Sequence, residues 1–557
     1  MKRVLLLILV VTAIAGEAQA QKKVRLKQAD FSRGGVKDGK RIDWVIGNVI
    51  FTQNQTTIYC DSAQIFKKEN SVEAYGRVRI TDGDSVTVTS KHLRYDGDKR
   101  VAYLRNDVVF VKLATATLYT DYLDYYRNLS EARYFNGGKL VDSTNNLTSK
   151  KGYYNTRTNM ASFKTKVVGV NPDYTLKSDT LQYNSKTKVV YFRDKTTVTD
   201  RDNQTAVYDD GFYDTKVTEK KSRLNRGTIQ TPTYEMKGDH YFLDDLKKYY
   251  TAKSNVIMTS KEENLTIYGD DGYYNKKTGV AKVYGNAWMA KVGDDGDTLF
   301  LSADTLVSIE NNNPSKKRML AYSNVKIFKS NLQGRADSLA YFSSDSVLYF
   351  YESPVMWTTE NQMTGDTIRV VLKNQNVDKV YLMSNAFVVA EDSLQNFNQM
   401  KGKRMTAIFR NKTIHHVDVD GNGESIYYAL QEEEKDLDSL LIKIVYVSGM
   451  NKMICSNMKL NFIDGKIDNF SAYVKPDATF TPPHEIKPED ERLKGFIWRD
   501  QERPIREDVV HGGKDAPARP GFSPDAVKGS QDNSQKAPAK KPGQKPIPQK
   551  GKSQRKP

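Results

Sequence analysis

The feature that most constrains the fold is a short phrase that recurs about every 30 residues along most of the chain. It consists of a polar residue, an apolar residue two positions later and, in many copies, a tyrosine two positions after that. A repeat of this length predicts stacked structural units rather than several unrelated domains. Clear copies are Asp121–Tyr125, Asp179–Tyr183 and Asp337–Tyr341, and looser copies begin at Asp61, Lys91, Lys151, Asp210, Asp239, Asp271, Asp304, Asp366, Lys403 and Asn457.

A second phrase falls between these copies and predicts strands. Apolar residues lead to a Gly, Asn or Asp, which supplies the backbone angles of a tight turn or bulge, and an alternating segment follows. In Val78-Arg79-Ile80 the two apolar side chains share one face of a strand. One unit cannot bury its apolar face alone, so we predict an all-β, elongated solenoid of stacked antiparallel strands. Copies of this phrase are Ala74–Ile80, Tyr103–Phe110, Val283–Trp288, Ala321–Ile327 and Tyr381–Phe387.

The ends of the chain differ from the repeats. Residues 1–20 combine Lys2 and Arg3, an apolar stretch and Ala18-Gln19-Ala20, the pattern of a cleaved export signal. We expect an entry segment over 21–40, repeats over 41–475, a proline-containing linker over 476–511 and a disordered Lys/Pro-rich tail over 512–557. The stretch from Gln431 to Leu441 is expected to be a short helix or an inserted loop. The net charge of +17 divides into +1, +8 and +8 for signal, body and tail.

Candidate chemistry is sparse. His415 and His416 are adjacent, so on a strand they face opposite sides and poorly suit one metal ion. Asp418-x-Asp420-x-Asn422-Gly423 matches the opening half of a calcium loop, but Ala429 stands where a bidentate Glu is required, and a turn is the simpler interpretation. The recurring aspartates share one phase, which favours a structural role in every unit. We therefore expect no catalytic residue, no metal and no cofactor.

The number of cysteines and the net charge exclude further classes of protein and partner. Two cysteines, Cys60 and Cys455, exclude a disulfide scaffold, and their distance along the repeats predicts that they do not meet. Export argues against a nucleic-acid partner, so the basic tail is expected to contact an anionic membrane surface instead.

Taken together, these phrases resemble the OstA/LptA-like family of lipopolysaccharide-transport proteins. The likeness rests on Asp-x-Leu-x-Tyr followed by Ala-Tyr-Gly-x-Val over residues 40–475. It implies a β-jellyroll (β-taco) fold, a periplasmic location, binding of lipopolysaccharide or a related glycolipid, and a role in outer-membrane assembly in a Gram-negative cell envelope. It also implies edge-strand pairing with other transport components. The repeat region is longer than one such domain, so two or three segments are expected to be fused.

The resemblance places a set of side chains on the inward face, where they would contact acyl chains without doing chemistry. These lipid-binding candidates are Val78, Ile80, Leu93, Tyr95, Val108, Phe110, Leu123, Tyr125, Leu181, Tyr183, Leu339 and Tyr341.

Two other classes stay open from the residues alone. One is an exported structural or adhesive β-solenoid with a filled interior and no lipid conduit. The other is a polysaccharide-active β-helix enzyme, which would need a cluster of acidic or basic residues on one rung, and the sequence offers none.

Overall fold

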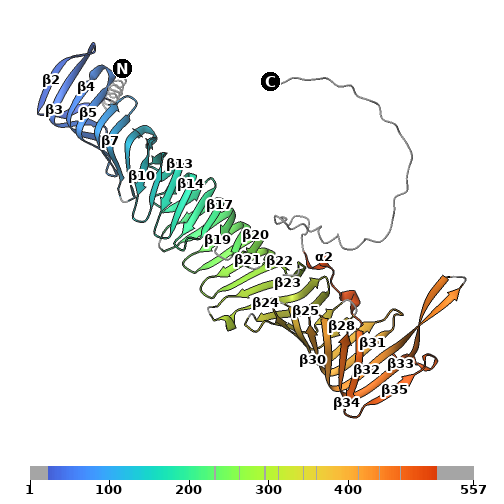
Figure 1. The fold of residues 1–557 in the computed structure, drawn as a ribbon. Helices are drawn as coiled ribbons and strands as arrows, with labels where there is room; N and C mark the ends of the chain where they lie inside the picture. The colour runs from blue at the N-terminus through green and yellow to red at the C-terminus, as the bar shows by residue number, and fades with distance from the viewer. Residues whose placement is uncertain are drawn as a thin grey trace, which may run out of the picture. The chain divides into compact units, whose positions relative to one another are not determined.

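The computed structural model describes residues 23–510, except 114, 217, 231–233, 263, 294–295, 312, 343, 359–360, 375, 412, 438–439 and 464–465. The expected signal peptide and basic tail lie outside the described residues. The chain divides after residue 511, and its first unit consists, over the described residues, of antiparallel strands in one continuous sheet (Figure 1). This confirms the predicted all-β, elongated β-jellyroll.

Most long strands pair with the strands before and after them in the chain, and short 3-10 turns join some of them. The first third contains β1 (Arg25–Gln28), β2 (Phe31–Lys37), β3 (Lys40–Gln53), β4 (Thr56–Phe66), β5 (Ser71–Asp82), β6 (Val86–Asp96), β7 (Val101–Lys112), β8 (Ala116–Tyr126), β9 (Glu131–Tyr134), β10 (Gly138–Val141), β11 (Asn146–Ser149) and β12 (Lys151–Asn155). The middle contains β13 (Met160–Val170), β14 (Tyr174–Asn184), β15 (Val189–Phe192), β16 (Thr196–Asp200), β17 (Thr205–Asp214), β18 (Lys221–Gln230), β19 (Tyr234–Asp244), β20 (Tyr249–Ser260), β21 (Leu265–Asn275), β22 (Val280–Val292), β23 (Thr298–Ile309) and β24 (Arg318–Lys329).

The last part contains β25 (Leu332–Phe342), β26 (Val347–Tyr351), β27 (Val355–Trp357), β28 (Asn361–Thr364), β29 (Thr367–Lys373), β30 (Asn376–Glu391), β31 (Phe397–Arg410), β32 (Thr413–Leu437), β33 (Leu440–Ile463), β34 (Lys466–Tyr473), β35 (Asp477–Thr481) and the short helix α2 (Arg506–Val509). The 3-10 turns are η1 (Lys67–Glu69), η2 (Arg127–Leu129), η3 (Pro314–Lys316), η4 (Pro483–Glu485), η5 (Pro488–Asp490) and η6 (Asp500–Glu502).

Most long strands bend at an irregularity near their middle, and the bends align into a corner that divides the sheet into two walls. In β5 the pairing shifts between Tyr75 and Val78, so the strand contributes one half to each wall. One repeat unit of about 30 residues therefore corresponds to two bent strands. First-wall segments include Ser71–Tyr75, His92–Asp96, Val101–Arg105 and Tyr122–Tyr126, and second-wall segments include Val78–Asp82, Val86–Thr89, Val108–Lys112 and Ala116–Thr120.

The recurring aspartates hold the corner. Gly76 lies at the bend of β5 with φ of +88°, and a Cβ there would lie 2.3 Å from Asp61 Oδ2 on β4. The Arg77 N–H donates to the same oxygen at 3.0 Å. A carboxylate on one strand thus binds the bulge of its neighbour, as expected from the structural interpretation of the repeat. A backbone N–H of the bulge also donates to Asp121 and to Asp179. At Asp210, Asp239, Asp304 and Asp366 the donor is instead the side-chain amide of an asparagine on the neighbouring strand, and Asp270 takes this role in place of Asp271.

Opposite the corner, the hairpin turns of the two walls meet along a line that we call the seam. Tips at residues 67–70, 97–100 and 127–130 end the first wall, and tips at residues 53–56 and 83–85 end the second. Successive first-wall tips are joined by backbone hydrogen bonds, including Gly97 N to Asn70 O at 2.9 Å and Arg127 N to Arg100 O at 3.1 Å.

The apolar interior between the walls forms two separate clusters. The first runs from Val45 to Val256 and the second from Val283 to Leu460. Cys60 and Cys455 are buried free thiols in different clusters, which confirms that they do not meet.

Two segments near the C-terminus differ from the sequence expectation. The described residues of the stretch expected to be a helix or loop, 431–437 and 440–441, instead extend the long hairpin of β32 and β33, because cross-strand pairing overrides their helix propensity (Figure 1). The calcium-loop lookalike is not a turn between strands. It is the corner bulge within β32, where Gly421 and Asn422 have positive φ angles and Gly421 N donates to Asn457 Oδ1 at 3.0 Å.

Residues 490–510, expected within a linker, form a strap across the outer face of the second wall. Three buried glutamines, Gln399, Gln362 and Gln333, lie on one cross-strand row beneath it. Gln362 donates to Ile497 O and accepts from Arg499 N, both at 2.7 Å. Because the side-chain amides match the strap's backbone groups, the strap lies in one fixed register. Gln399 likewise binds Glu491 O and Leu493 N, Gln333 binds the Arg503 guanidinium, and Val509 is buried beside Trp288 and Phe300.

Candidate functional site: the apolar interior and its seam

The structure places all the predicted inward residues on the inner faces of the walls. Eleven of the twelve are at most 2% exposed, and Tyr341 is half-buried against the second cluster. They do not form one site. Leu339 and Tyr341 belong to the second cluster and the other ten to the first, so the set spans two separate interiors.

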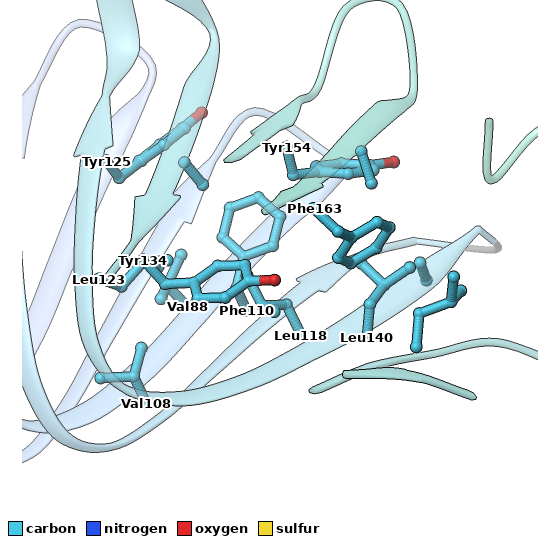
Figure 2. Packing of buried hydrophobic residues seen from close by; sticks show 14 of the residues in the cluster. Val88, Val108, Phe110, Leu118, Leu123, Tyr125, Tyr134, Leu140, Tyr154 and Phe163 are labelled. Carbon is cyan, nitrogen blue, oxygen red and sulfur yellow. The ribbon is translucent and has the colours of Figure 1, made fainter. Parts of the chain in front are cut away.

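The first interior is filled by aromatic side chains. The Phe110 ring lies 5.7 Å from that of Tyr125 and 5.9 Å from that of Tyr154, edge-on in both cases (Figure 2). Leu118, Leu140 and Phe163 pack in the same cluster (Figure 2). A ligand could therefore enter only if the walls moved apart.

Several inward aromatic residues were missed by the sequence pattern. In the copies that begin at Lys151 and Asp210, the inward tyrosines are Tyr154 and Tyr213, one position earlier than Tyr125 is in its own copy. The one-residue offset hides these copies from a fixed phase, although a tyrosine is still present in each. Other inward aromatic residues outside the prediction are Phe51, Tyr134, Phe163, Phe192, Tyr208 and Tyr241.

Tyrosine hydroxyls cross the seam from one wall to the other. Tyr125 of the first wall donates to Asp82 Oδ2 of the second at 2.8 Å. Tyr95 donates to Gln53 Oε1 at 2.5 Å. Tyr183 donates to Asp142, and the Tyr174 hydroxyl donates to Asp245 in the opposite direction across the seam. These contacts recur over the first cluster and close it by side-chain hydrogen bonds.

Basic side chains of the first wall reinforce the same closures. Arg127 Nη2 lies 2.7 Å from Asp82 Oδ1, and Lys188 Nζ lies 2.8 Å from Asp142 Oδ2. Lys220 Nζ lies 2.5 Å from Asp173 Oδ2. The Asp142 side chain is only 1% exposed, so its charge depends on these partners.

The protonation of the seam follows from burial and these contacts. Burial alone would raise the pKa of Asp142, but the Lys188 ammonium, the Tyr183 hydroxyl and the backbone N–H groups of Thr144 and Asn145 outweigh it and lower the pKa. Burial, followed by the charge of Asp82, raises the pKa of Tyr125. The tyrosine hydroxyl therefore stays protonated and able to donate.

Among the described residues, no group of three or more His, Cys, Asp or Glu side chains could hold a metal ion. The expectation that His415 and His416 face opposite sides of a strand is wrong, because the pairing of β31 with β32 shifts at this point and the two Nδ1 atoms lie 2.7 Å apart. Within that same part of the chain, no helix has the length and apolar character to cross a membrane.

Comparison with known proteins identifies the N-terminal region. Residues 21–179 match the family model described as OstA-like protein, which confirms the resemblance found in the repeats. No curated protein matches the chain. Similar solved structures include LptH of Pseudomonas aeruginosa, titled the LptA-homologous periplasmic component of the conserved lipopolysaccharide transport device. That match has 14% identity, covers 22% of this chain and 82% of LptH, and has a TM-score of 0.19.

Proposed function

We propose that this chain, whose residues 21–179 belong to the OstA-like family, is an exported periplasmic carrier of lipopolysaccharide or a related glycolipid. It holds the lipid's acyl chains between its two walls during outer-membrane assembly. One observation carries the proposal. The first apolar cluster, from Val45 to Val256, lies behind a seam at which side-chain hydrogen bonds hold the walls together, while backbone pairing runs within each wall.

The energies favour exchange of seam contacts for lipid. Burial of one methylene returns about 0.8 kcal/mol, so a 12-carbon chain returns about 10 kcal/mol. A net hydrogen bond contributes about 1 kcal/mol, or about 1.5–3 kcal/mol where one partner is charged. Acyl burial therefore offsets the cost of opening a few seam contacts. The inward candidates named above, from Val78 to Tyr341, would contribute apolar contact alone.

The second cluster supports the expected fusion of segments. Because the interiors separate between Val256 and Val283, we interpret the body as at least two jellyroll segments joined through one continuous sheet. A fused body would supply in one chain the length that shorter carriers reach by assembly.

Partners in this proposal attach at the two ends of the sheet. At one end β2 pairs with β3, and at the other β35 pairs with β33. Phe31 and Phe480, on these end strands, are exposed. Other lipid-transport components would add strands to such edges by backbone pairing. The basic tail would contact an anionic membrane surface.

Site-specific photo-crosslinking tests the carrier function in cells. A photoreactive residue at Phe110 or Leu181, both buried in the first interior, is expected to capture glycolipid. The matched control is Tyr119, which lies on β8 with Phe110's neighbour Leu118 but faces outward and is exposed. Capture at Tyr119 alone, or at neither inward position, would reject the carrier function.

A structural envelope solenoid is the second candidate, and the filled first interior favours it. Mass spectrometry of the mature protein purified without detergent separates the two functions. A carrier is expected to retain glycolipid that is lost when an inward position such as Leu181 is changed to Asp in a variant that still folds, whereas a scaffold would contain none.

A further inference from the structure

The basic residues along the seam form ion pairs in which another anion could replace the carboxylate. Arg127 and Asp82 have side chains 13% and 15% exposed, respectively, and Lys188 pairs with the almost fully buried Asp142. In each pair the cation comes from the first wall and the carboxylate from the second. Separation of the walls at the seam would therefore leave each cation without its anion.

Arg127 is also short of acceptors while the seam is closed. Its Nη2 contacts Asp82, but among the described residues its buried Nε and Nη1 atoms have no hydrogen-bond partner. A guanidinium presents five donors in a fixed plane, and a buried donor without an acceptor is costly. Asp82, which also accepts from Tyr125, therefore leaves two donors of this side chain unsatisfied.

A phosphate group offers what the closed seam lacks. It carries more charge than a carboxylate and has three oxygens that accept hydrogen bonds, and arginine binds it with two parallel N–H donors. An amphiphile whose acyl chains lie between the walls has its headgroup at the seam, beside Arg127 and Lys188. A phosphate would replace Asp82 as the partner of Arg127 at one rung, or Asp142 as the partner of Lys188 at another.

We propose that Arg127 and Lys188 mark two headgroup positions along the seam for phosphate-bearing amphiphiles, which Asp82 and Asp142, respectively, occupy as internal anions while the seam is closed. This inference rests on the proposed carrier function and adds the chemical class of the ligand to it. It predicts that removing one partner of an ion pair and removing the other change the affinity for the phosphate-bearing amphiphile in opposite directions. Loss of the cation weakens binding, and loss of the carboxylate strengthens it.

The test compares two amphiphiles with the same 12-carbon alkyl chain. The mature full-length protein is titrated calorimetrically with dodecyl phosphate and with the uncharged dodecyl maltoside, both below their micellar concentrations. We expect dodecyl phosphate to bind about tenfold more tightly, as one charge-assisted hydrogen-bonded contact implies. R127Q should weaken this preference, and D82N should strengthen the binding of dodecyl phosphate by a larger factor than the binding of dodecyl maltoside.

The controls separate a headgroup site from a structural ion pair. R79Q removes a similar charge from the outward face of β5, the strand that contains Asp82, and should leave the preference unchanged. If R127Q does not fold, K188Q and the salt dependence of the unmodified protein give the same information, because the phosphate preference should fall with ionic strength. Inorganic phosphate should compete weakly, and competition as strong as that of dodecyl phosphate would reject a headgroup site in favour of a free-anion site.

The outcomes distinguish the two proposals. Binding of neither amphiphile would reject the carrier function itself. Equal binding of both, with R127Q and D82N without effect, would overturn the headgroup site and leave the carrier function standing. Weaker phosphate binding in both variants would also overturn it, because that result describes an ion pair that only stabilises the closed walls.

Discussion

Removal of one hydroxyl should loosen the seam without disturbing the interior. In Tyr125→Phe the buried ring stays, while the 2.8 Å hydrogen bond to Asp82 is lost. Hydrogen bonds to charged groups contribute about 1.5–3 kcal/mol. Asp82 keeps Arg127 and part of its solvent contact, so we expect the lower end, about 1.5 kcal/mol.

A cost of this size has a measurable consequence. About 1.4 kcal/mol is a factor of ten in an equilibrium, so the open seam should be about tenfold more populated near this position. The Gly83 and Arg127 N–H groups are hydrogen-bonded at the neighbouring tips, and their amide hydrogen exchange reports this opening. We expect both to exchange about tenfold faster, measured by mass spectrometry on peptides that span the tips.

Tyr134→Phe is the matched control. Its hydroxyl is also buried and hydrogen-bonded, to Ser149 Oγ at 2.6 Å, but it lies beside the corner instead of at the seam. This variant should lose about 1 kcal/mol of stability with no faster exchange at the tips. Equal amide hydrogen exchange rates at the tips in Tyr125→Phe and Tyr134→Phe would refute the idea that tyrosines close the seam.

Three further predictions concern the corner, the buried carboxylate and the strap. Gly76→Ala should destabilise the body by about 2 kcal/mol, because its φ is positive and the new Cβ would meet Asp61; thermal unfolding of the variant checks this. Since the pKa of Asp142 is lowered in the fold, its contribution is present above its unfolded pKa of about 3.9 and is lost as pH falls below that value; Asp142→Asn should remove that part of the acid sensitivity in pH-dependent unfolding. Gln362→Ala should release the strap between Ile497 and Arg499, seen as faster proteolysis near Arg499, and an unchanged cleavage rate there would contradict the assigned contacts.

The sequence pattern was sufficient for the stacked strands and their inward face. Alternation in segments such as Val78-Arg79-Ile80 is a local property, and stacking repeats it in every unit, so Val78 and Ile80 lie where expected. The corner was predictable in part. The Gly or Asn of the second phrase indicated a turn or bulge, but the carboxylate that binds it comes from a neighbouring strand, as Asp61 does for Gly76.

The seam and the strap could not be predicted in the same way. Tyr125 and Asp82 are 43 residues apart and belong to different phrases, so no periodic pattern relates them. The strap binds through single glutamines such as Gln362 and Gln399, 135 and 92 residues from the backbone carbonyls they contact. Such contacts depend on which strands become neighbours, and that is settled only once the whole sheet has formed.

Backbone hydrogen bonds between successive hairpin tips of the first wall couple the opening of one rung of the seam to the opening of the next. Each tip is tied to the next by a backbone hydrogen bond, as Arg127 is to Arg100 and Thr156 is to Ser130. A tip that swings outward therefore pulls on the tips beside it, so that opening at one rung lowers the cost of opening the next. A ligand would then move along the interior by opening the seam locally, one rung at a time, with each rung closing again behind it. The two walls would not have to separate along their whole length at once.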